Sequence, residues 1–324
     1  MHRRLLNLFH LASLLFVLSA SLSAAEAFQW DEPRPGEYRL RRGETPVIVC
    51  MTSYDDSTRE RREETYKVYT HVFGPKSGDL ITKGPGGLYP HHRGIYLGWN
   101  KTLVGDQSYD FWHCPPASGA HQRLDGTPEM KAAADEASIT LKINWNDKEG
   151  KPVVVERRTL TVQGLKDHPG WSIDVRSELH SQRGEIRLEG DRQHAGLQFR
   201  AAQEVAEKES ARYVRPAGFP QEPEAHQVDD KGDPPAHINL NWLTMTYETN
   251  GKQYTVEYFE DPGLPKPSLY SERPYGRFGA FFKTVLKPDS PLVLRYRLNI
   301  TEDAPESPEA IQKRYDDFAA GLKG

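Results

Sequence analysis

Apolar and polar residues alternate along much of this chain, and the alternation predicts β-strands. Within 138–145 the apolar side chains of Ile139, Leu141, Ile143 and Trp145 share one face, because successive side chains of a strand point to opposite faces. The arrangement of apolar residues predicts further strands at 46–51, 66–73, 152–162, 171–179, 277–286 and 291–301, and a pair of strands within 186–200.

A hairpin and one helix complete the predicted fold. Asn250-Gly251 stands between the alternating segments 239–248 and 253–259, and this dipeptide is the strongest short-range signal of a hairpin turn. Near the C-terminus, Ser307 can cap a helix over 308–322, with Pro308 at its first position. Ten or more strands and one terminal helix predict an all-β protein: a large antiparallel β-sandwich with the helix outside the sheets.

Two long segments break the alternation. Residues 104–135 are rich in Gly, Pro and polar residues, and we expect little secondary structure there. A segment of this length inside a compact domain is usually functional or disordered, and its histidines and carboxylates favour function. Residues 207–236 are polar and rich in proline; we interpret them as a surface excursion rather than a flap over a site.

The N-terminus carries a targeting pattern. Arg3 and Arg4 precede a mostly apolar run, and Ala25-Glu26-Ala27 is a small-x-small cleavage pattern. We therefore predict a signal peptide over 1–27 and an exported mature chain, 28–324, that forms one domain. The run is short for an uncleaved membrane anchor, and no later stretch is apolar enough to span a bilayer.

Charge and cysteine content narrow the partners. Without the two arginines and one glutamate of the signal segment, 40 basic and 45 acidic residues remain. Their signs are interspersed, so we expect no nucleic acid partner. The polar motifs favour a carbohydrate or other small polar ligand instead. Cys50 and Cys114 could form a disulfide in an exported protein, or Cys114 could be a metal ligand.

The first candidate site lies at residues 83–94, where His91, His92 and Arg93 adjoin. Pro90 restricts Tyr89 to an extended conformation. On an extended backbone only one of the two histidines can face a given cavity, and we favour His92 with Arg93 nearby, with His91 almost as plausible.

The second candidate group follows at 110–113, Asp-Phe-Trp-His. Asp110 can fix the tautomer of His113 and raise its basicity. Trp112 either stacks on a ligand or closes the space under a loop. His121 has the same two interpretations, ligand contact or structural contact.

Two more groups come from later strands. The first of these two carries a larger number of polar residues than an ordinary sandwich strand: Glu189, Asp191, His194, Gln198 and Arg200. These side chains either line a concave sheet or form a solvated face. Arg273 and Tyr275 could line the same groove or belong to a turn.

The histidines allow two kinds of chemistry. Together with the carboxylates they are suitable ligands for zinc or another divalent metal, although no His-Glu-x-x-His motif is present. Without a metal, a histidine and a carboxylate could act as general base and acid. No Gly-x-Ser-x-Gly or cysteine nucleophile motif is present.

Four motifs carry a resemblance to a known family. They are Gly-Leu-Tyr-Pro-His-His-Arg-Gly at 87–94, Asp-Phe-Trp-His at 110–113, His194 with Gly-Leu-Gln-Phe at 196–199, and Arg-Pro-Tyr-Gly at 273–276. The chain resembles an exported bacterial family of unknown function, frequent in planctomycetes, whose members are often labelled "methane oxygenase PmoA". We reject methane oxidation, because a methane mono-oxygenase subunit of that name spans the membrane several times and this chain has at most its signal segment.

The resemblance implies a β-sandwich similar to the galactose-mutarotase or jelly-roll type and an association with sugar degradation. We therefore predict a carbohydrate-active enzyme: a hydrolase, lyase or epimerase. His92, His113 or His194 would be the base, and Glu189 or Asp191 the acid or orienting group. The substrate would contact the side chains of Tyr89, His91, Arg93, Asp110, Trp112, His121, Gln198, Arg200, Arg273 and Tyr275. The alternative is a non-catalytic carbohydrate-binding or envelope scaffold protein.

Overall fold

The computed structural model describes residues 27–221 and 237–322. The signal peptide predicted for 1–27 lies outside the described residues except for Ala27, and so does 222–236 of the polar excursion.

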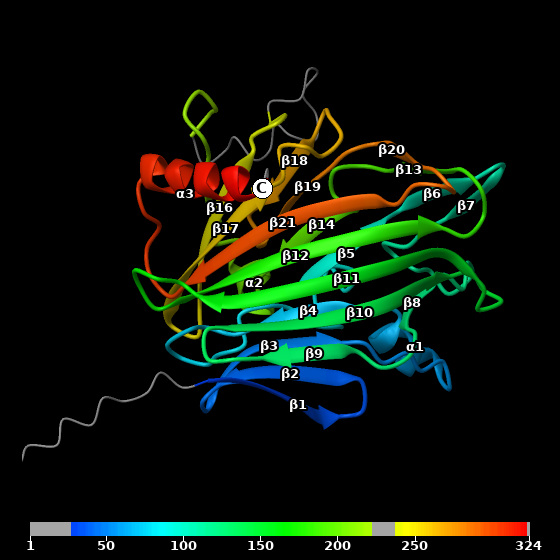
Figure 1. The fold of residues 1–324 in the computed structure, drawn as a ribbon, viewed down its shortest axis with the longest axis horizontal. Coiled ribbons are helices and arrows are strands. Elements are labelled where there is room, and N and C mark those ends of the chain that lie inside the picture. Colours follow the sequence, from blue (N-terminus) through cyan, green and yellow to red (C-terminus); the bar gives the residue numbers. More distant parts are fainter. Residues whose placement is uncertain (1–26, 222–236, 323–324) are drawn as a thin grey trace, which may run out of the picture.

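One layer of the fold is an eight-stranded sheet in the order β1-β2-β3-β4-β5-β14-β19-β18, with every neighbouring pair antiparallel (Figure 1). Its strands are β1 (Phe28–Arg34), β2 (Glu37–Arg42), β3 (Thr45–Met51), β4 (Tyr69–Val72), β5 (Ile95–Trp99), β14 (Ala195–Arg200), β19 (Arg277–Phe281) and β18 (Leu269–Arg273).

The second layer is a nine-stranded sheet in the order β15-β16-β17-β21-β12-β11-β10-β8, with β9 also paired to β10. Its strands are β15 (Arg212–Val214), β16 (Trp242–Thr249), β17 (Lys252–Glu260), β21 (Leu292–Thr301), β12 (Gly170–Ser181), β11 (Pro152–Gly164), β10 (Glu136–Asn146), β8 (His121–Leu124) and β9 (Glu129–Ala132). A third, small sheet has the order β20-β13-β6-β7. It is made of β20 (Thr284–Leu286), β13 (Ile186–Glu189), β6 (Lys101–Val104) and β7 (Gln107–Tyr109).

The two large sheets bury one shared apolar core, so the predicted all-β sandwich is confirmed. Side chains from both sheets belong to one buried cluster, including Leu197 of β14 and Tyr258 of β17. The Tyr258 hydroxyl donates to the Leu197 carbonyl 3.2 Å away, which links the two layers directly. The predicted hairpin is the pair β16–β17, with Asn250 and Gly251 both at positive φ in its turn.

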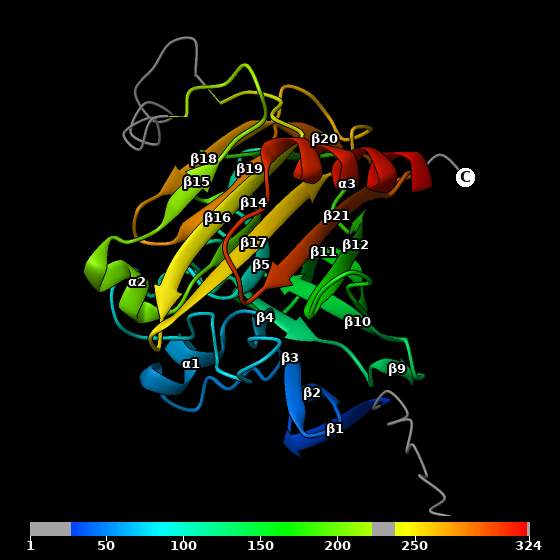
Figure 2. The same ribbon diagram turned by 90° about the vertical axis from the view of Figure 1, so that its left-hand side faces the viewer.

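In the part of the chain that the structure describes, three helices lie outside the sheets: α1 (Arg59–Thr65), α2 (Gln203–Lys208) and α3 (Pro308–Gly321). The predicted C-terminal helix is confirmed as α3, which packs Ile311, Tyr315 and Phe318 against Trp242 and Phe259 on the outer face of the nine-stranded sheet (Figure 2). None of the helices in the described residues is long and apolar enough to cross a membrane.

Two features differ from the sequence predictions. The segment 104–135 carries three short strands, β7, β8 and β9, where little secondary structure was expected. Strands of three or four residues are too short to show a period of two, and they form here because longer strands next to them supply the pairing. Helices α1 and α2 were also not predicted, because they are short and mostly polar.

Cys50 and Cys114 are both buried free thiols, so the disulfide is not formed. Burial raises the pKa of each thiol to about 12, which keeps both protonated and unreactive at neutral pH.

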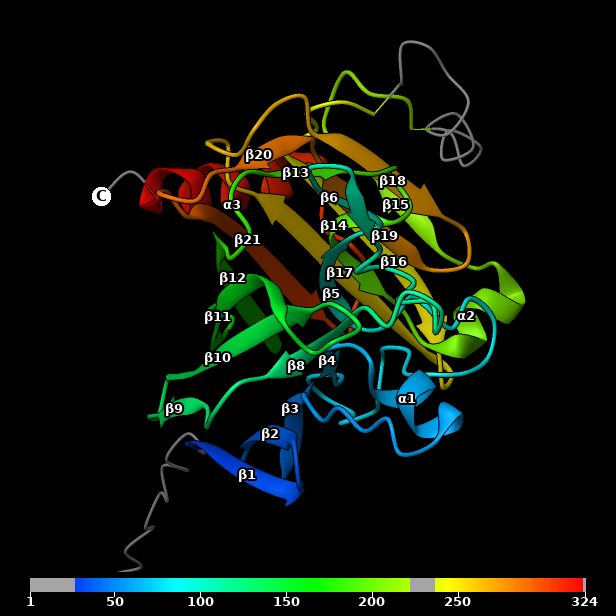
Figure 3. The ribbon, with the colours of Figure 1, turned by 90° about the vertical axis from the view of Figure 1, so that its right-hand side faces the viewer.

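The outer face of the eight-stranded sheet is where the polar motifs gather. Leu97, Phe199 and Phe278 point into the core, so their alternating neighbours point to the other face of the sheet. A small separate cluster of Tyr69, Tyr96 and Trp112 covers part of that outer face. The loop before β5 and the loop after β7 lie over it, next to α1 (Figure 3).

Candidate functional site

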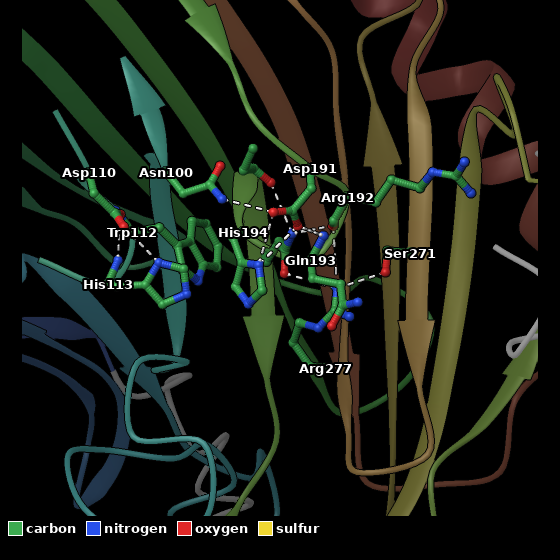
Figure 4. Close-up of polar contacts among 12 residues, drawn as sticks. Asn100, Asp110, Trp112, His113, Asp191, Arg192, Gln193, His194, Ser271 and Arg277 are labelled. Carbon is green, nitrogen blue, oxygen red and sulfur yellow. Dashed lines mark hydrogen bonds and ion pairs between the residues drawn. The ribbon is translucent and has the colours of Figure 1, made fainter. Parts of the chain in front are cut away.

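Three imidazoles converge on one point from three separate segments. One ring nitrogen each of His91, His113 and His194 lies within 4.8 Å of the other two. The ring centroids are 4.9 Å apart for His91–His113, 5.4 Å for His91–His194 and 4.4 Å for His113–His194. All three residues are half-buried, so a ligand can reach them. His113 and His194 lie side by side in front of Trp112 (Figure 4).

Two of the three imidazoles are held by the same local structure, an Asp-x-x-His segment. The Asp110 carboxylate accepts hydrogen bonds from the backbone N–H groups of Trp112 and His113, at 2.9 and 2.8 Å, and its other oxygen lies 2.8 Å from His113 Nδ1. In the second segment the Asp191 carboxylate accepts from the Gln193 N–H at 2.9 Å and lies 2.9 Å from His194 Nδ1. Each aspartate therefore folds its own turn and orients its own imidazole.

The carboxylates fix which imidazole nitrogen is available. Burial acts to raise the pKa of Asp110, but hydrogen bonds from the His113 side chain and backbone and from the Trp112 N–H outweigh it and lower that pKa. For Asp191 burial is again opposed, by His194, Asn100 and the backbone, and its pKa falls well below the usual range. An ionised carboxylate only accepts hydrogen bonds, so each Nδ1 donates and each Nε2 keeps its lone pair.

His91 reaches the same point from a turn rather than from an extended strand. Tyr89 has φ of +53°, and the His92 N–H donates to the Tyr89 carbonyl at 3.1 Å. The expectation of an extended Tyr89 is wrong, because this turn outweighs the preference of a residue before proline. The rings of His91 and His92 consequently lie side by side, 4.3 Å apart, instead of on opposite faces. Burial, and then the charges of Lys67, His113 and His194, lower the pKa of His91 to about 2, so its imidazole is neutral.

His92 and Trp112 lie behind the three imidazoles. His92 is 2% exposed and stacks on the His194 ring at 5.5 Å and 14°. Trp112 is 1% exposed and packs against Tyr96 at 5.1 Å and His92 at 5.7 Å. Of the two interpretations of Trp112, the structure has the buried plug, with no exposed face for a sugar ring.

A cavity of about 630 Å³ lies beside His91 and His113. Its walls come from α1, from the loop 85–93 and from Cys114, Pro115 and Pro116. Three carboxylates of α1 line this wall, and two of them are engaged by arginines of the same helix, Glu63 with Arg59 and Glu64 with Arg61. The volume suits a mono- or oligosaccharide unit or a ligand of similar size.

The polar face of β14 and β19 continues the site from His194. The Gln198 amide nitrogen donates to the carbonyls of Arg192 and Ala195, and its oxygen accepts from Arg277 at 3.2 Å. Arg200 and Arg277 are paired in register on these two strands.

Tyr275 joins this face to the loop of residues 83–94. Its ring lies 4.3 Å from Tyr89, 6.1 Å from His92, and 5.3 Å from the Arg200 guanidinium. Tyr89 is 42% exposed, so this end of the site is open to solvent.

The structure places four other sequence-predicted residues in structural contacts. Glu189 pairs with Arg187 at 3.2 Å on β13. His121 has Nδ1 2.9 Å from the Gly119 carbonyl and Nε2 3.2 Å from Asn146, and its ring stacks on Tyr54. Neither Glu189 nor His121 belongs to the group formed by His91, His113 and His194.

Arg93 and Arg273 act on the backbone. Arg93 donates to the carbonyls of Pro90, Glu63 and Glu64, so it ties the histidine loop to α1. Arg273 donates to the carbonyl of Glu272.

Several residues of the site were not among those predicted from sequence: Asn100, Lys67, Lys83, Ser271 and Arg277. Asn100 donates to Asp191 at 2.8 Å, and the Ser271 hydroxyl oxygen accepts from Arg277 at 2.9 Å. Lys67 donates to the His91 carbonyl. The only sequence signal for Lys67 and Arg277 was a basic residue inside an apolar, strand-like segment. Because an unpaired charge is costly to bury, such a residue is a candidate for a functional role.

The three imidazoles fit a divalent transition metal. Neutral imidazoles are ligands that zinc prefers, at about 2.1 Å, and three of them leave one position for water or substrate. Ligands at that distance in a tetrahedron are about 3.4 Å apart, so nitrogen atoms that now lie within 4.8 Å of one another would have to approach to hold one ion. A carboxylate behind a metal-binding histidine is the usual outer partner of such sites.

Comparison with known proteins gives a family but no assigned activity. A family model described as a family of unknown function (DUF6807) matches residues 41–316, which include every residue of the site. No protein of curated function matches the sequence.

Proposed function

We propose that this chain, which belongs to the DUF6807 family, is a metal-dependent enzyme that acts on a carbohydrate by hydrolysis or elimination. The observation that carries the proposal is the convergence of His91, His113 and His194 within 4.8 Å, with a carboxylate behind two of them.

The arrangement of carboxylates favours a metal over metal-free acid–base catalysis. Asp110 and Asp191 are both engaged with imidazole Nδ1 atoms, and Glu189 pairs with Arg187. Within the described part of the chain, no predicted carboxylate is therefore left to act as general acid beside the three histidines. A bound divalent ion would polarise a substrate oxygen or lower the pKa of a bound water, and so supply the acid or the nucleophile.

The chain's own residues would then have distinct roles. His91, His113 and His194 would hold the ion through their free ring nitrogens, and Asp110 and Asp191 would keep the rings in place. The cavity between α1 and the loop 85–93 would admit the sugar. The PmoA label of similar sequences enters only as a resemblance, and methane is not the proposed substrate. Export through the predicted signal peptide is part of the proposal.

The first test of the proposed function is the metal content of the purified protein. The mature protein is purified without chelator, and its metal is counted by elemental analysis alongside thermal unfolding with and without a chelator. We expect about one transition metal ion per chain and a lower Tm after its removal, because an ion that binds only the folded state stabilises it.

A matched pair of histidine variants follows. His113→Ala should lose the metal and all turnover of an oligosaccharide panel, whereas His180→Ala, an exposed histidine on β12, should keep both. A protein that takes up no zinc, manganese, cobalt or nickel overturns the proposal. One that binds metal and sugars but turns over none of them is the non-catalytic binding protein instead.

A further inference from the structure

Five basic side chains are buried around the site. Lys67, Lys83, Arg93, Arg200 and Arg277 are each at most 4% exposed. Among the described residues, none of the five has a carboxylate within ion-pair distance; their hydrogen-bond partners are backbone carbonyls and neutral side chains. Burial of a charge without a counter-charge is costly, so the guanidinium groups among them call for an anion.

Arg200 and Arg277, on the eight-stranded sheet, have N–H donors without a partner in the described structure. Arg277 donates to the Gln198 side chain and engages Ser271, but its Nη2 has no partner in the described structure. Arg200 Nη1 donates to the carbonyls of Ala201 and Tyr275, whereas its Nε and Nη2 have no hydrogen-bond partner in the described structure. Both guanidinium groups lie within 6 Å of the Tyr275 ring, at 5.3 and 5.8 Å.

These donors belong to the same site as the imidazoles. Tyr275 lies between the two arginines and the His92 ring, and Arg277 Nε is 3.3 Å from the Tyr275 hydroxyl. Burial and then the positive charge of Arg277 hold the pKa of His92 well below its usual value. The two carboxylates that contact the imidazoles in the described structure, Asp110 and Asp191, are already engaged.

We propose that Arg277 and Arg200 form a subsite for an oxyanion on the substrate, so that the enzyme acts on acidic sugars. This inference rests on the proposed function and names its substrate class. The carboxylate of a uronic acid fits a guanidinium through two parallel hydrogen bonds, and a phosphate or sulfate ester offers the same oxygen geometry. The metal would hold the reacting end of the sugar while the arginines hold its charged group.

The test compares charged and neutral sugars of the same ring. Glucuronate, glucose 6-phosphate, glucose 6-sulfate and glucose are titrated calorimetrically into the metal-loaded mature chain. A guanidinium–carboxylate bond should make at least one charged sugar bind about 10-fold or more tightly than glucose. The charged sugar that binds most tightly identifies which oxyanion the subsite takes.

Variants assign the preference to the subsite. In Arg277→Gln the ratio of the two affinities should fall to near 1, whereas Arg187→Gln, which removes a half-exposed arginine of β13, should keep the wild-type ratio. If Arg277→Gln does not fold, Arg200→Gln serves the same purpose, and Tm shifts of the wild type with glucuronate against glucose give an independent measure.

The outcomes separate the two proposals. Equal binding of all four sugars to a protein that holds its metal and turns over a neutral glycoside overturns the oxyanion subsite alone. Absence of metal overturns the proposed function, while a preference for the charged sugar that depends on Arg277 would still support the subsite.

Discussion

Both large sheets of this protein carry buried arginines, but the two sheets differ in whether a carboxylate pairs with the guanidinium. In the nine-stranded sheet, Arg158 faces Glu156 with both groups at most 3% exposed, joined by hydrogen bonds of 2.7 and 2.9 Å. Glu156 also accepts from Trp145 at 2.9 Å and from Ser177 at 2.6 Å. On the eight-stranded sheet, Arg200 and Arg277 are as deeply buried and have no such carboxylate among the described residues.

A second structural pair repeats the first pattern. Arg215 and Glu272 are at most 1% exposed, and the Arg215 Nε and Nη2 atoms donate to the two carboxylate oxygens of Glu272, at 2.9 and 2.5 Å. His237 Nδ1 lies 2.7 Å from the same carboxylate. In both pairs a carboxylate therefore neutralises the buried guanidinium, whereas the equally buried Arg93 is satisfied by three backbone carbonyls. Arg200 and Arg277 have neither a carboxylate nor a full set of hydrogen-bond partners in the described structure, and this difference points to a ligand.

The largest effect should come from breaking a structural pair. Glu156→Gln leaves Arg158 buried without a counter-charge, and we expect a loss of about 3–5 kcal/mol in the free energy of unfolding, measured by urea denaturation. The control is Glu178→Gln, which removes a partly exposed partner of Arg176 and should cost less than about 1 kcal/mol. Equal losses in the two variants would contradict the role given to Glu156.

The second prediction asks what the carboxylates of the site do. Asp191→Asn should weaken metal binding by about 10–100-fold, because an amide no longer fixes the His194 tautomer. The metal affinity is measured by competition with a chromogenic chelator, and Asp125→Asn, at the exposed Lys142 pair, is the control. A drop in stability with no change in metal affinity would make Asp191 a turn-forming residue only.

A smaller effect concerns pH. Burial, and then the charges of Arg200 and Arg93, lower the pKa of Lys83 to about 7. Lys83 is therefore charged below pH 7 and neutral above it, so the affinity for glucuronate should fall by about 3- to 10-fold between pH 6 and 8. Titrations with glucose over the same range show any contribution of the metal. A Lys83→Met variant with the wild-type pH dependence would exclude Lys83 as the cause.

The smallest effect should be that of Arg277→Gln on stability. Removing a buried, unpaired charge relieves its desolvation, while the lost hydrogen bonds to Gln198 and Ser271 each contribute about 0.5–1.5 kcal/mol, so the two changes largely offset each other. We expect the free energy of unfolding to stay within about 1 kcal/mol of wild type, compared with the much larger loss for Glu156→Gln. A similar loss of unfolding free energy in Arg277→Gln and Glu156→Gln would contradict the proposed difference between the two sheets.

The regular part of the fold was predictable, since long strands show their period in the sequence. The alternation at 138–145 falls within β10, and the Ser307 cap and Pro308 mark the start of α3. The strands β7 to β9 were missed, because pairing with neighbouring strands stabilises them more than their own residues do.

The site was predictable in its residue types but not in its geometry. The sequence singled out His113 and His194 with their aspartates, and these side chains do lie together. It favoured His92 over His91, whereas the turn at Tyr89 brings His91 to the other two imidazoles. Which residues meet across 22 and 81 positions of chain depends on strand pairing over long distances, and a single sequence contains no direct signal for that.

The Asp-x-x-His turn has a consequence for tracing the history of this protein. Because four consecutive residues set both the backbone turn and the direction of the imidazole, the unit depends little on the sheet that carries it. It could be inherited, duplicated or transferred to another loop as one piece. Distant relatives should then be recognisable by two such tetrapeptides and a His-His pair in the right order, even where the strands between them have diverged beyond recognition.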